Sequence, residues 1–448
     1  MKRIVSYLDR FFFEEVSATG FGLMRIAWAS SVLIYLLGSA SDTVRYYSDA
    51  GIMPQNLGYL VFRSEYRFSL LQYITEPHAV VALWCVFVLT LTCTIIGVWP
   101  RLMTVASVLL LFSFHERNLQ PLGGGDTVLR LVGFLLMIAP EISACSLARL
   151  ELQWENWHAH RSLGEGGRKT GAFLKPLRTQ IWPYRLLLWQ IMIIYLYSAF
   201  DKMQGTMWLD GTTVESVFHH SHFFRYGKEI ADSLTWISPF ACFYTLVAEF
   251  SWLLLLVPRE VWQVLPPRWK RHSLKRWVIG FSLLFHWGIF AFMDVGSFPL
   301  AMSAAFIGLL LDEDFATFKS IWNRRMQGRI IVLYDGVCGL CRRSTFTLGM
   351  LDFLGRLTPV DFRDKAIRSK YAPEITEENL DRAMHIKLPD GRTFKGFDAF
   401  RVLCRHLPLT MPLTPLLYLP GVAPIGRVIY GKIAEGRKKC AGGACRHT

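Results

Sequence analysis

Two cysteines three residues apart, Cys338 and Cys341, form the sequence CGLC in the C-terminal part of the chain. An apolar run at 330–334 precedes them and predicts a buried strand, and an Asp-Gly pair predicts the turn that follows. Apolar residues at helical spacing come after the motif, so we expect CGLC to open a helix. Helix N–H groups favour a thiolate at the first cysteine, and two arginines after the motif add positive charge. We therefore expect a redox-active disulfide, with Cys338 as the attacking thiolate and Cys341 as the resolving thiol.

The alternative for these cysteines is half of a zinc site, with Cys440 and Cys445 of the terminal CAGGAC supplying the other two thiolates. Zinc-binding pairs usually lie on knuckle turns, whereas CGLC follows an expected strand and opens an expected helix. The pattern therefore favours redox chemistry, and no metal is expected. Three interpretations remain for Cys440 and Cys445 themselves: a second redox pair, a metal-binding clip, or part of a frayed tail.

The elements around CGLC predict a small α/β domain over residues 329–448. Strands are expected at 330–334 and 357–362, and two more at 384–388 and 392–395, joined by a Pro-Asp-Gly hairpin turn. Strand, CxxC, helix, strand, helix, hairpin, helix is a thioredoxin-like order, for which about 120 residues suffice.

Three stretches of this domain carry a family resemblance: YDGVCGLCRRS, MHIKLPDGRTFKGFDAF and PLTPLLYLPGVAPIGRVIYGKIAEGRKKC. Together they resemble the DCC family of thiol-disulfide oxidoreductases over essentially all of 329–448. The resemblance implies a thiol-disulfide oxidoreductase. One departure from thioredoxins concerns Met384, because no proline precedes the strand expected there, where thioredoxins place a proline beside the thiols.

Composition predicts that the rest of the chain, residues 1–328, is a membrane domain. Hydrophobic residues make up 52% of the 448 residues and charged residues 19%, against about 25% charged in soluble domains. The net charge of +14 is typical of cytoplasmic flanks that face anionic lipid. Binding of nucleic acid requires a soluble basic face, and we do not expect it.

Long apolar runs predict about eight transmembrane helices, since helices are the only open structure that satisfies its backbone in hydrocarbon. Several runs are long enough to cross a core of about 30 Å, and others are short. The expected fold is thus a polytopic α-helical membrane domain followed by a small thioredoxin-like α/β domain. The eight runs are 21–37, 79–99, 102–114, 127–139, 181–200, 234–257, 277–293 and 298–311.

The lysines and arginines between these runs predict an orientation. With the N-terminus inside, the inner loops carry 16 Lys and Arg against 7 in the outer loops, which is a positive-inside bias. No cleavable signal peptide is expected at the N-terminus. We therefore expect an integral protein of the plasma (bacterial-type inner) membrane, with both termini in the cytoplasm.

The membrane part has a resemblance of its own, in SFHERN, GGGDTVLRLVGFLLMIAPE and WPYRLLLWQIMIIYLYSAFDKMQGTMWLDGT. These segments resemble the HTTM domain, the transmembrane module related to vitamin K-dependent gamma-carboxylase. The resemblance implies a catalytic lysine at Lys202, ahead of Trp208 and Gly211, and an active-site histidine region at His115. It implies a pocket for a quinone, lipid or peptide rather than gamma-carboxylation itself, since no large domain for docking a propeptide follows.

Intramembrane polar residues point to the same region, because each is costly in lipid and faces a cavity or a partner. These residues are Arg25, Asp126, Arg130, Asp201, Lys202, Glu249 and His286. We select Asp126, Arg130 and Asp201 from this set as candidate binding residues of the pocket, together with Trp208 from the resemblance. A desolvated lysine loses its proton readily and can act as a base.

The alternative is structural pairing, of Lys202 with an acid such as Asp210, or of Arg25 with Glu249. The His219-His220-Ser-His222 cluster lacks further ligands at reliable spacing, so solvated loop histidines are the favoured interpretation there.

Two functions of different class follow. The first is a membrane-bound thiol-disulfide oxidoreductase that acts on a thiol- or disulfide-bearing protein or peptide, with lipid around it and a quinone as candidate cofactor. The second is a non-enzymatic membrane scaffold whose CGLC is a zinc or structural site. A hydroquinone-dependent carboxylase or epoxidase is a third candidate. The sequence leaves the enzyme class, the substrate and the oligomeric state open.

Overall fold

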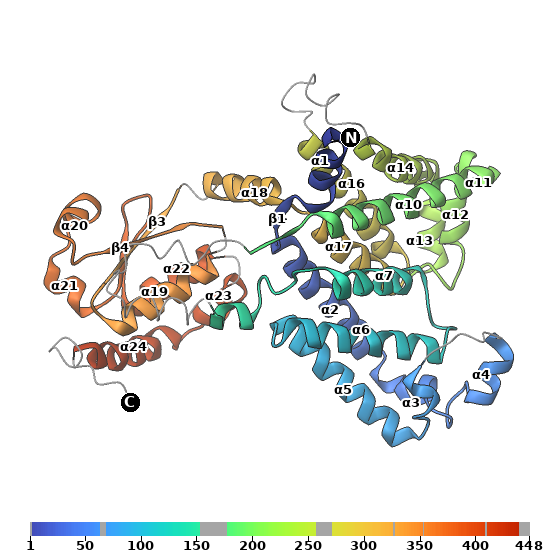
Figure 1. The fold of residues 1–448 in the computed structure, drawn as a ribbon, viewed down its shortest axis with the longest axis horizontal. Coiled ribbons are helices and arrows are strands. Elements are labelled where there is room, and N and C mark those ends of the chain that lie inside the picture. The colour runs from blue at the N-terminus through green and yellow to red at the C-terminus, as the bar shows by residue number, and fades with distance from the viewer. Residues whose placement is uncertain are drawn as a thin grey trace. The chain divides into compact units, whose positions relative to one another are not determined.

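The protein was analysed as a computed structural model that describes residues 2–62, 69–152, 177–256, 271–325, 328–352, 354–407 and 410–438. These residues divide into two compact units. We call residues 2–152 and 177–314 the helical unit, and residues 315–438 the C-terminal unit. Figure 1 shows helices throughout the first and a small sheet with covering helices in the second.

The helical unit contains the eight predicted apolar runs, and each coincides with a helix. They are α2 (Thr19–Gly38), α5 (Pro77–Ile96), α6 (Pro100–Arg117), α7 (Gly124–Ile138), α10 (Trp182–Gln204), α14 (Ser238–Phe250) with a 3-10 turn on either side, α16 (Arg271–Phe292) and α17 (Phe298–Gly308). Shorter helices are α1 (Lys2–Phe13), α3 (Thr43–Tyr47), α4 (Gln55–Phe62), α11 (Thr206–Leu209), α12 (Thr213–Phe218) and α13 (Lys228–Ser233), and α18 (Asp312–Arg325) begins at the end of the unit. A two-stranded antiparallel ribbon joins β1 (Glu15–Ser17) to β2 (Arg178–Gln180).

Four of the described helical segments are long and apolar enough to cross a membrane: Thr19–Gly38, Pro77–Ile96, Trp182–Gln204 and Thr235–Leu256. This is compatible with a membrane protein, and eight crossings remain a prediction. α16 is 22 residues long but is not among the four. Its first turns carry Arg271, Lys275 and Arg276, and the last two bind the carboxylate of Asp314.

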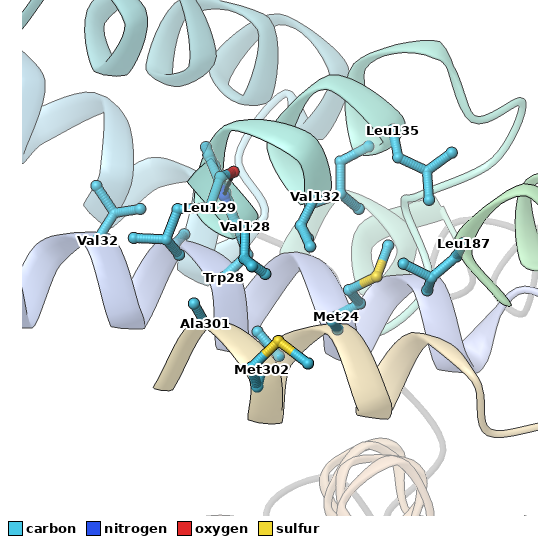
Figure 2. Packing of buried hydrophobic residues seen from close by; sticks show 14 of the residues in the cluster. Met24, Trp28, Val32, Val128, Leu129, Val132, Leu135, Leu187, Ala301 and Met302 are labelled. Carbon is cyan, nitrogen blue, oxygen red and sulfur yellow. Dashed lines mark hydrogen bonds between the residues drawn. The ribbon is translucent and has the colours of Figure 1, made fainter. Parts of the chain in front are cut away.

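The core of the helical unit lies along α2, between α7 and α17. Figure 2 shows Met24 and Trp28 of α2 facing α7 on one side and α17 on the other. The indole N–H of Trp28 donates to the carbonyl oxygen of Leu129 at 2.8 Å. Ala301, Ala304 and Ala305 of α17 are fully buried, and small residues of this kind allow helix backbones to approach closely.

The C-terminal unit contains a four-stranded mixed sheet in the order β4-β3-β5-β6. Its strands are β3 (Ile330–Tyr334), β4 (Leu357–Asp361), β5 (His385–Lys387) and β6 (Thr393–Lys395). β3 pairs in parallel with β4 and antiparallel with β5, and β5 pairs antiparallel with β6. All four strands fall where the sequence predicts them, within one residue at each end.

Helices cover both faces of this sheet, because successive strand residues point to opposite sides. One face packs Val332 against Leu348 of α19 (Gly339–Leu351) and Leu403 of α22 (Gly396–His406). The other packs Leu333 against Leu380 of α21 (Glu377–Arg382) and against α20 (Lys365–Tyr371). α23 (Thr414–Leu417) and α24 (Val422–Lys438) complete the unit.

One predicted helix between the second and third strands is in fact two, α20 and α21. Pro373 follows the end of α20 by two residues and cannot continue a helix. The predicted Pro389-Asp390-Gly391 hairpin turn is present, with Gly391 at φ +86° and the N–H of Leu388 donating to the carbonyl of Arg392 at 2.9 Å.

Candidate functional site

The loop that carries CGLC begins at an edge where two parallel strands end together. Gly336, just after β3, donates its N–H to Asp361 Oδ1 at 2.9 Å, and Arg363, just after β4, donates its N–H to the same oxygen at 3.0 Å. A Cβ on Gly336 would overlap the Asp361 carboxylate. Glycine is therefore required here by close approach rather than by its dihedral angles.

Asp335 holds the next part of this loop. Its carboxylate receives two hydrogen bonds from the Arg363 guanidinium, at 3.1 Å to Oδ1 and 2.9 Å to Oδ2. It also accepts the backbone N–H of Val337 at 3.0 Å. Burial raises the pKa of Asp335, but the hydrogen bonds from Arg363, Val337 and the Cys338 backbone together hold it below its ordinary value. The carboxylate is thus ionised and fixes the backbone directly before the first cysteine.

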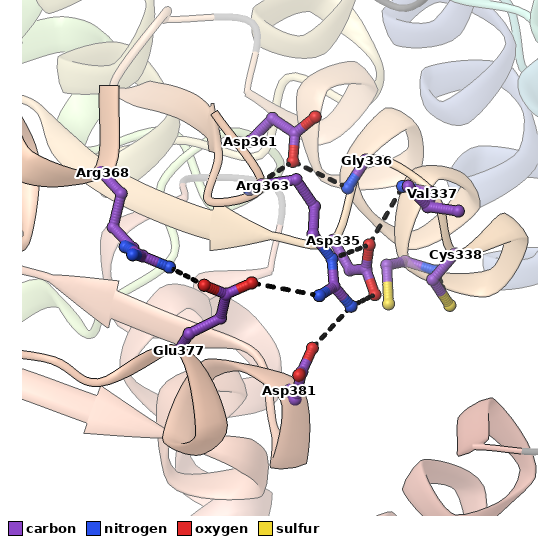
Figure 3. Close-up of polar contacts among 10 residues, drawn as sticks. Asp335, Gly336, Val337, Cys338, Asp361, Arg363, Arg368, Glu377 and Asp381 are labelled. Carbon is purple, nitrogen blue, oxygen red and sulfur yellow. Dashed lines mark hydrogen bonds and ion pairs between the residues drawn. The ribbon is translucent and has the colours of Figure 1, made fainter. Parts of the chain in front are cut away.

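Arg363 is in turn surrounded by acids, as Figure 3 shows. Its Nη2 lies 2.6 Å from Asp381 Oδ1, and its Nη1 lies 3.5 Å from Glu377 Oε1. Glu377 is also paired with Arg368. The hydrogen bond to Asp335 raises the pKa of Arg363 above its ordinary value, so the charge that holds the loop is permanent.

Cys338 is the N-cap residue of α19, with extended backbone at φ −72° and ψ 120°. Its Sγ accepts the backbone N–H of Cys341 at 3.4 Å. N-cap side chains normally satisfy a helix N–H group with oxygen, and here sulfur takes that place. Negative charge at a helix N-terminus is stabilised, so this position favours a thiolate at Cys338. The prediction that CGLC opens a helix is confirmed.

Apolar side chains beside both cysteines are exposed. Val337 precedes Cys338 and is 71% exposed, and Leu340 precedes Cys341 and is 42% exposed. Both cysteines are themselves half-buried. The motif therefore presents a small apolar surface around the sulfur atoms.

A cavity of about 530 Å³ opens beside Cys341, between α19 and α24. Apolar side chains make up most of its wall, and Arg343 and Asp335 also line it. Its size is in the range of ligand-binding pockets. Its main apolar lining residues are Leu348, Phe397, Ile429, Tyr430 and Ile433.

Three of the residues predicted for a membrane pocket lie together in the helical unit. Arg130 Nε donates to His115 Nδ1 at 3.1 Å, and His115 Nε2 lies 3.9 Å from Asp126 Oδ1. Asp126 also accepts the backbone N–H of Gly123 at 2.8 Å and the hydroxyl of Ser297 at 3.0 Å. His115 and Asp126 are buried. This cluster fastens the start of α7 to the end of α6 and to the start of α17.

The other predicted pocket residues lie at the end of α10 and in α11. Lys202 Nζ lies 2.7 Å from Glu249 Oε1 of α14 and 5.3 Å from the centre of the Trp208 ring. Lys202 also donates to Ser198. Asp201, one residue before, is exposed. The structural alternative paired Lys202 with an acid such as Asp210, and the acid in the structure is Glu249.

The suggested pairing of Arg25 with Glu249 is wrong. Arg25 is buried in α2 and donates to backbone carbonyls, including Ile142 at 3.1 Å and Cys145 at 3.0 Å. The physical reason is that these carbonyls lie in the segment just after α7, where the chain has left the helix and its acceptors lack helical partners.

Metal ligands do not gather in the part of the chain that the structure describes. No group of three or more His, Cys, Asp or Glu side chains there could hold an ion. His219 hydrogen bonds to Asp232 at 2.7 Å, and the three loop histidines are exposed. Cys440 and Cys445, the other half of the alternative zinc site, lie outside the described residues.

The site contains residues that the sequence did not single out, Asp361 and Arg363 above all. The sequence could have predicted their proximity to Asp335. If the strands at 330–334 and 357–362 are parallel neighbours, the residues that follow both strands meet at the same edge of the sheet. Asp335-Gly336 was interpreted only as a turn. The contribution of α24 to the cavity had no signal, because its position depends on packing between distant segments.

Comparison with known proteins agrees with this geometry for the C-terminal unit. Residues 332–443 match the family model of DCC1-like thiol-disulfide oxidoreductases. The matched segment contains CGLC, the Asp335 network and α24, and the match supports a thiol-disulfide oxidoreductase role for this part of the chain. No curated protein and no solved structure matches the chain. None of the comparisons supports an HTTM domain in the helical unit.

Proposed function

We propose that the domain at residues 332–443 exchanges thiols and disulfides through Cys338 and Cys341, with Cys338 as the nucleophile. The single observation that carries the proposal is the position of Cys338 Sγ at the N-cap of α19, where it accepts a helix N–H. A thiolate there gains from the helix dipole and from a charge-assisted hydrogen bond. The Asp335–Arg363 pair supports the proposal because it holds the loop that presents this sulfur.

The exchange follows from two adjacent sulfur atoms. The Cys338 thiolate attacks one sulfur of a partner disulfide, so a mixed disulfide forms and the partner's second sulfur leaves as a thiolate. Cys341 then loses its proton and attacks Cys338 Sγ, which forms the Cys338–Cys341 disulfide and releases the partner's first sulfur. The partner gains two electrons and two protons, and the reverse sequence oxidises a partner dithiol.

The partner proposed is a protein or peptide that bears a thiol or disulfide. The exposed side chains of Val337 and Leu340 support this choice, because they offer apolar contact on either side of Cys338. A nucleic-acid partner remains outside the proposal, and lipid is proposed only as the surroundings of the helical unit.

For the helical unit we propose eight membrane crossings in a plasma membrane, with both termini and the C-terminal unit in the cytoplasm. The coincidence of eight apolar runs with eight helices and the 16-to-7 loop charge bias support this topology. In a variant whose only cysteine is Cys338, a membrane-impermeant maleimide should label the protein only after cells are permeabilised. Labelling of intact cells would overturn the topology.

A carboxylase-like or quinone-binding pocket at Lys202 has less support. The amine of Lys202 is already held by the carboxylate of Glu249 and the hydroxyl of Ser198. We therefore propose a structural role for this pair. A quinone as cofactor would be tested by its oxidation of the Cys338–Cys341 dithiol in the purified protein.

Trapping tests the proposed nucleophile in the full-length protein. Cys341→Ser should accumulate a mixed disulfide at residue 338 when glutathione disulfide is added, and Cys338→Ser should lose at least about 100-fold in exchange rate. Cys404→Ser is the matched control, because Cys404 is buried in the same unit, and it should exchange at the wild-type rate. Equal trapping by both motif variants would refute the assignment. Stoichiometric zinc with unreactive thiols would replace it with the metal alternative.

A further inference from the structure

Exposed apolar side chains of the C-terminal unit gather on α24 and on the segment just before it. Eight of the thirteen large hydrophobic residues that are exposed among the described residues of this unit lie between positions 413 and 433. α20 and α21, which cover the other face of the sheet, contribute none of the thirteen. Three of the eight precede α24 and are about half exposed: Leu413, Leu416 and Leu419.

Four more lie on one side of α24, at the spacing of an amphipathic helix. The opposite side fastens α24 to its own unit, because the hydroxyl of Tyr430 accepts the backbone N–H of Met384 at 3.0 Å. A Cβ on Gly426 would overlap the Phe397 ring, so the helix is also closely packed there. α24 therefore cannot turn its four exposed side chains inward. Each of them is more than half exposed: Ile425, Val428, Ile429 and Ile433.

We propose that this aliphatic face, the four residues of α24 with the three leucines before it, docks on the surface of the lipid bilayer. A helix of this kind lies parallel to the membrane and buries its apolar side about 5–10 Å into the boundary between headgroups and acyl chains. The proposal rests on the membrane placement proposed for the helical unit and adds a lipid contact to the C-terminal unit.

The first support is charge. From residue 405 to residue 438 the sequence has five Lys and Arg and a single acid, Glu435, whereas residues 374–398 have four Lys and Arg and six Asp and Glu. Lys432 is exposed and lies seven residues after Ile425, on the aliphatic side of α24. A lysine in this position keeps its amine among phosphate groups while its stem lies on hydrocarbon. The segment thus complements anionic lipid.

The second support is the kind of side chain on the face. Residues that contribute most to binding of a protein partner are enriched in Trp, Tyr and Arg, and Leu and Val are under-represented among them. The aliphatic face consists of Leu, Ile and Val. Contact with lipid requires apolar area and no shaped counterpart. The face therefore fits hydrocarbon better than it fits a polypeptide.

The third support is the membrane itself. Four described segments of the same chain are long and apolar enough to cross a bilayer. A covalent link turns a second contact with the same membrane into an intramolecular event with a high effective concentration. A contact that is weak by itself is then sufficient to hold the face on lipid.

This docking has a consequence for the thiol site. Ile429 and Ile433 belong to the aliphatic face and also line the cavity beside Cys341. Contact of α24 with lipid therefore brings the cavity and CGLC to the membrane surface, where a thiol- or disulfide-bearing partner would meet them.

Quenching by labelled lipid tests the contact in the full-length protein. An environment-sensitive fluorescent amino acid replaces Val428 in nanodiscs of phosphatidylcholine and phosphatidylglycerol, with a nitroxide on the upper acyl chain of some lipids. The control carries the same amino acid at Ser369, an exposed residue of α20 on the other face of the sheet. We expect quenching at position 428 to be at least about threefold stronger than at position 369.

Two further variants probe the apolar and the charged parts of the face. Ile425→Asp should reduce the quenching at position 428 about threefold, and Ser369→Asp should leave it unchanged. Lys432→Glu should remove the difference in quenching between nanodiscs with and without phosphatidylglycerol.

Equal quenching at positions 428 and 369 would overturn the proposed docking. Blue-shifted fluorescence at position 428 without quenching would also overturn it, because polypeptide would then cover the face. Trapping of glutathione disulfide by Cys341→Ser, measured with and without Ile425→Asp, should be the same. Trapping without lipid quenching would thus overturn the docking and leave the proposed function standing, and quenching without trapping would do the reverse.

Discussion

Charged side chains are used in opposite ways by the helical unit and by the C-terminal unit. In the helical unit, Lys202 forms an ion pair with the buried carboxylate of Glu249. Each charged group therefore has the other as its partner. In the C-terminal unit, the pair of Asp335 with Arg363 does not involve the reactive atom but holds the backbone that presents Cys338. The difference teaches that a polar residue in an apolar helix is weak evidence of chemistry, whereas a reactive atom placed beside a fixed network is stronger evidence.

The largest loss of stability is expected when the ion pair of Lys202 with Glu249 in the helical unit is broken. Lys202→Met removes the cation from Glu249, whose side chain is 4% exposed, and the loss of one partner of a buried pair costs about 3 kcal/mol or more. Thermal unfolding in detergent should show this as a clear fall in the midpoint. The double variant Lys202→Met/Glu249→Gln should recover most of the loss. A neutral effect of Lys202→Met would indicate that the pair is not structural.

A smaller effect is expected at the loop of the C-terminal unit. Gly336→Ala forces a Cβ against the Asp361 carboxylate, and overpacking of this kind costs about 2 kcal/mol. It should also slow alkylation of Cys338 by shifting the loop. Gly431→Ala is the matched control in α24, where a Cβ meets no atom within 4 Å, and it should leave stability unchanged or slightly raised. Similar losses in both variants would argue against close approach as the reason for Gly336.

The Asp335 network predicts a pH dependence with a definite sign. The pKa of Asp335 is lower when folded than its ordinary value of about 3.9. Its contribution to stability is therefore complete above about pH 4 and is lost as the pH falls through the folded-state pKa. Asp335→Asn should cost about 1.5 kcal/mol at neutral pH and flatten the loss of stability between about pH 4 and pH 2. An unchanged acid limb would show that other carboxylates dominate it.

The smallest effect on stability is expected at Val337. This residue distinguishes side chains that position the loop from side chains that contact a protein partner. Val337→Ser changes a side chain that is 71% exposed, so the free energy of unfolding should change by less than about 0.5 kcal/mol. Trapping of protein partners by Cys341→Ser should nevertheless fall several-fold when Val337→Ser is added. Trapping of glutathione disulfide should not change. An equal fall for both would mean that Val337 acts through the loop and not through partner contact.

Local pattern was sufficient to predict much of the C-terminal unit. The run at 330–334 and the two strands around Asp390-Gly391 lie where alternation and turn residues placed them. CGLC lies at the start of α19, as the helical spacing of the apolar residues after it predicts. The division of one expected helix at Pro373 could also have been found, because proline ends helices.

Tertiary partners could not be predicted in the same way. Glu249 lies 47 residues from Lys202, and the sequence offered nearer acids as equally plausible partners. Arg25 binds carbonyl groups, which carry no signature in the sequence. The ribbon of β1 and β2 joins segments more than 160 residues apart and is too short to show an alternating pattern.

The thiol pKa of Cys338 compared with that of Cys341 tests the central claim most directly. The rate of iodoacetamide alkylation of each cysteine would be followed by mass spectrometry from pH 4 to pH 10 in the reduced full-length protein. Cys338 should react with a midpoint at least one unit below the ordinary value of about 8.5, and Cys341 should react later and more slowly. A midpoint for Cys338 at or above that of Cys341 would contradict the account, because the N-cap of α19 would then confer no preference for a thiolate.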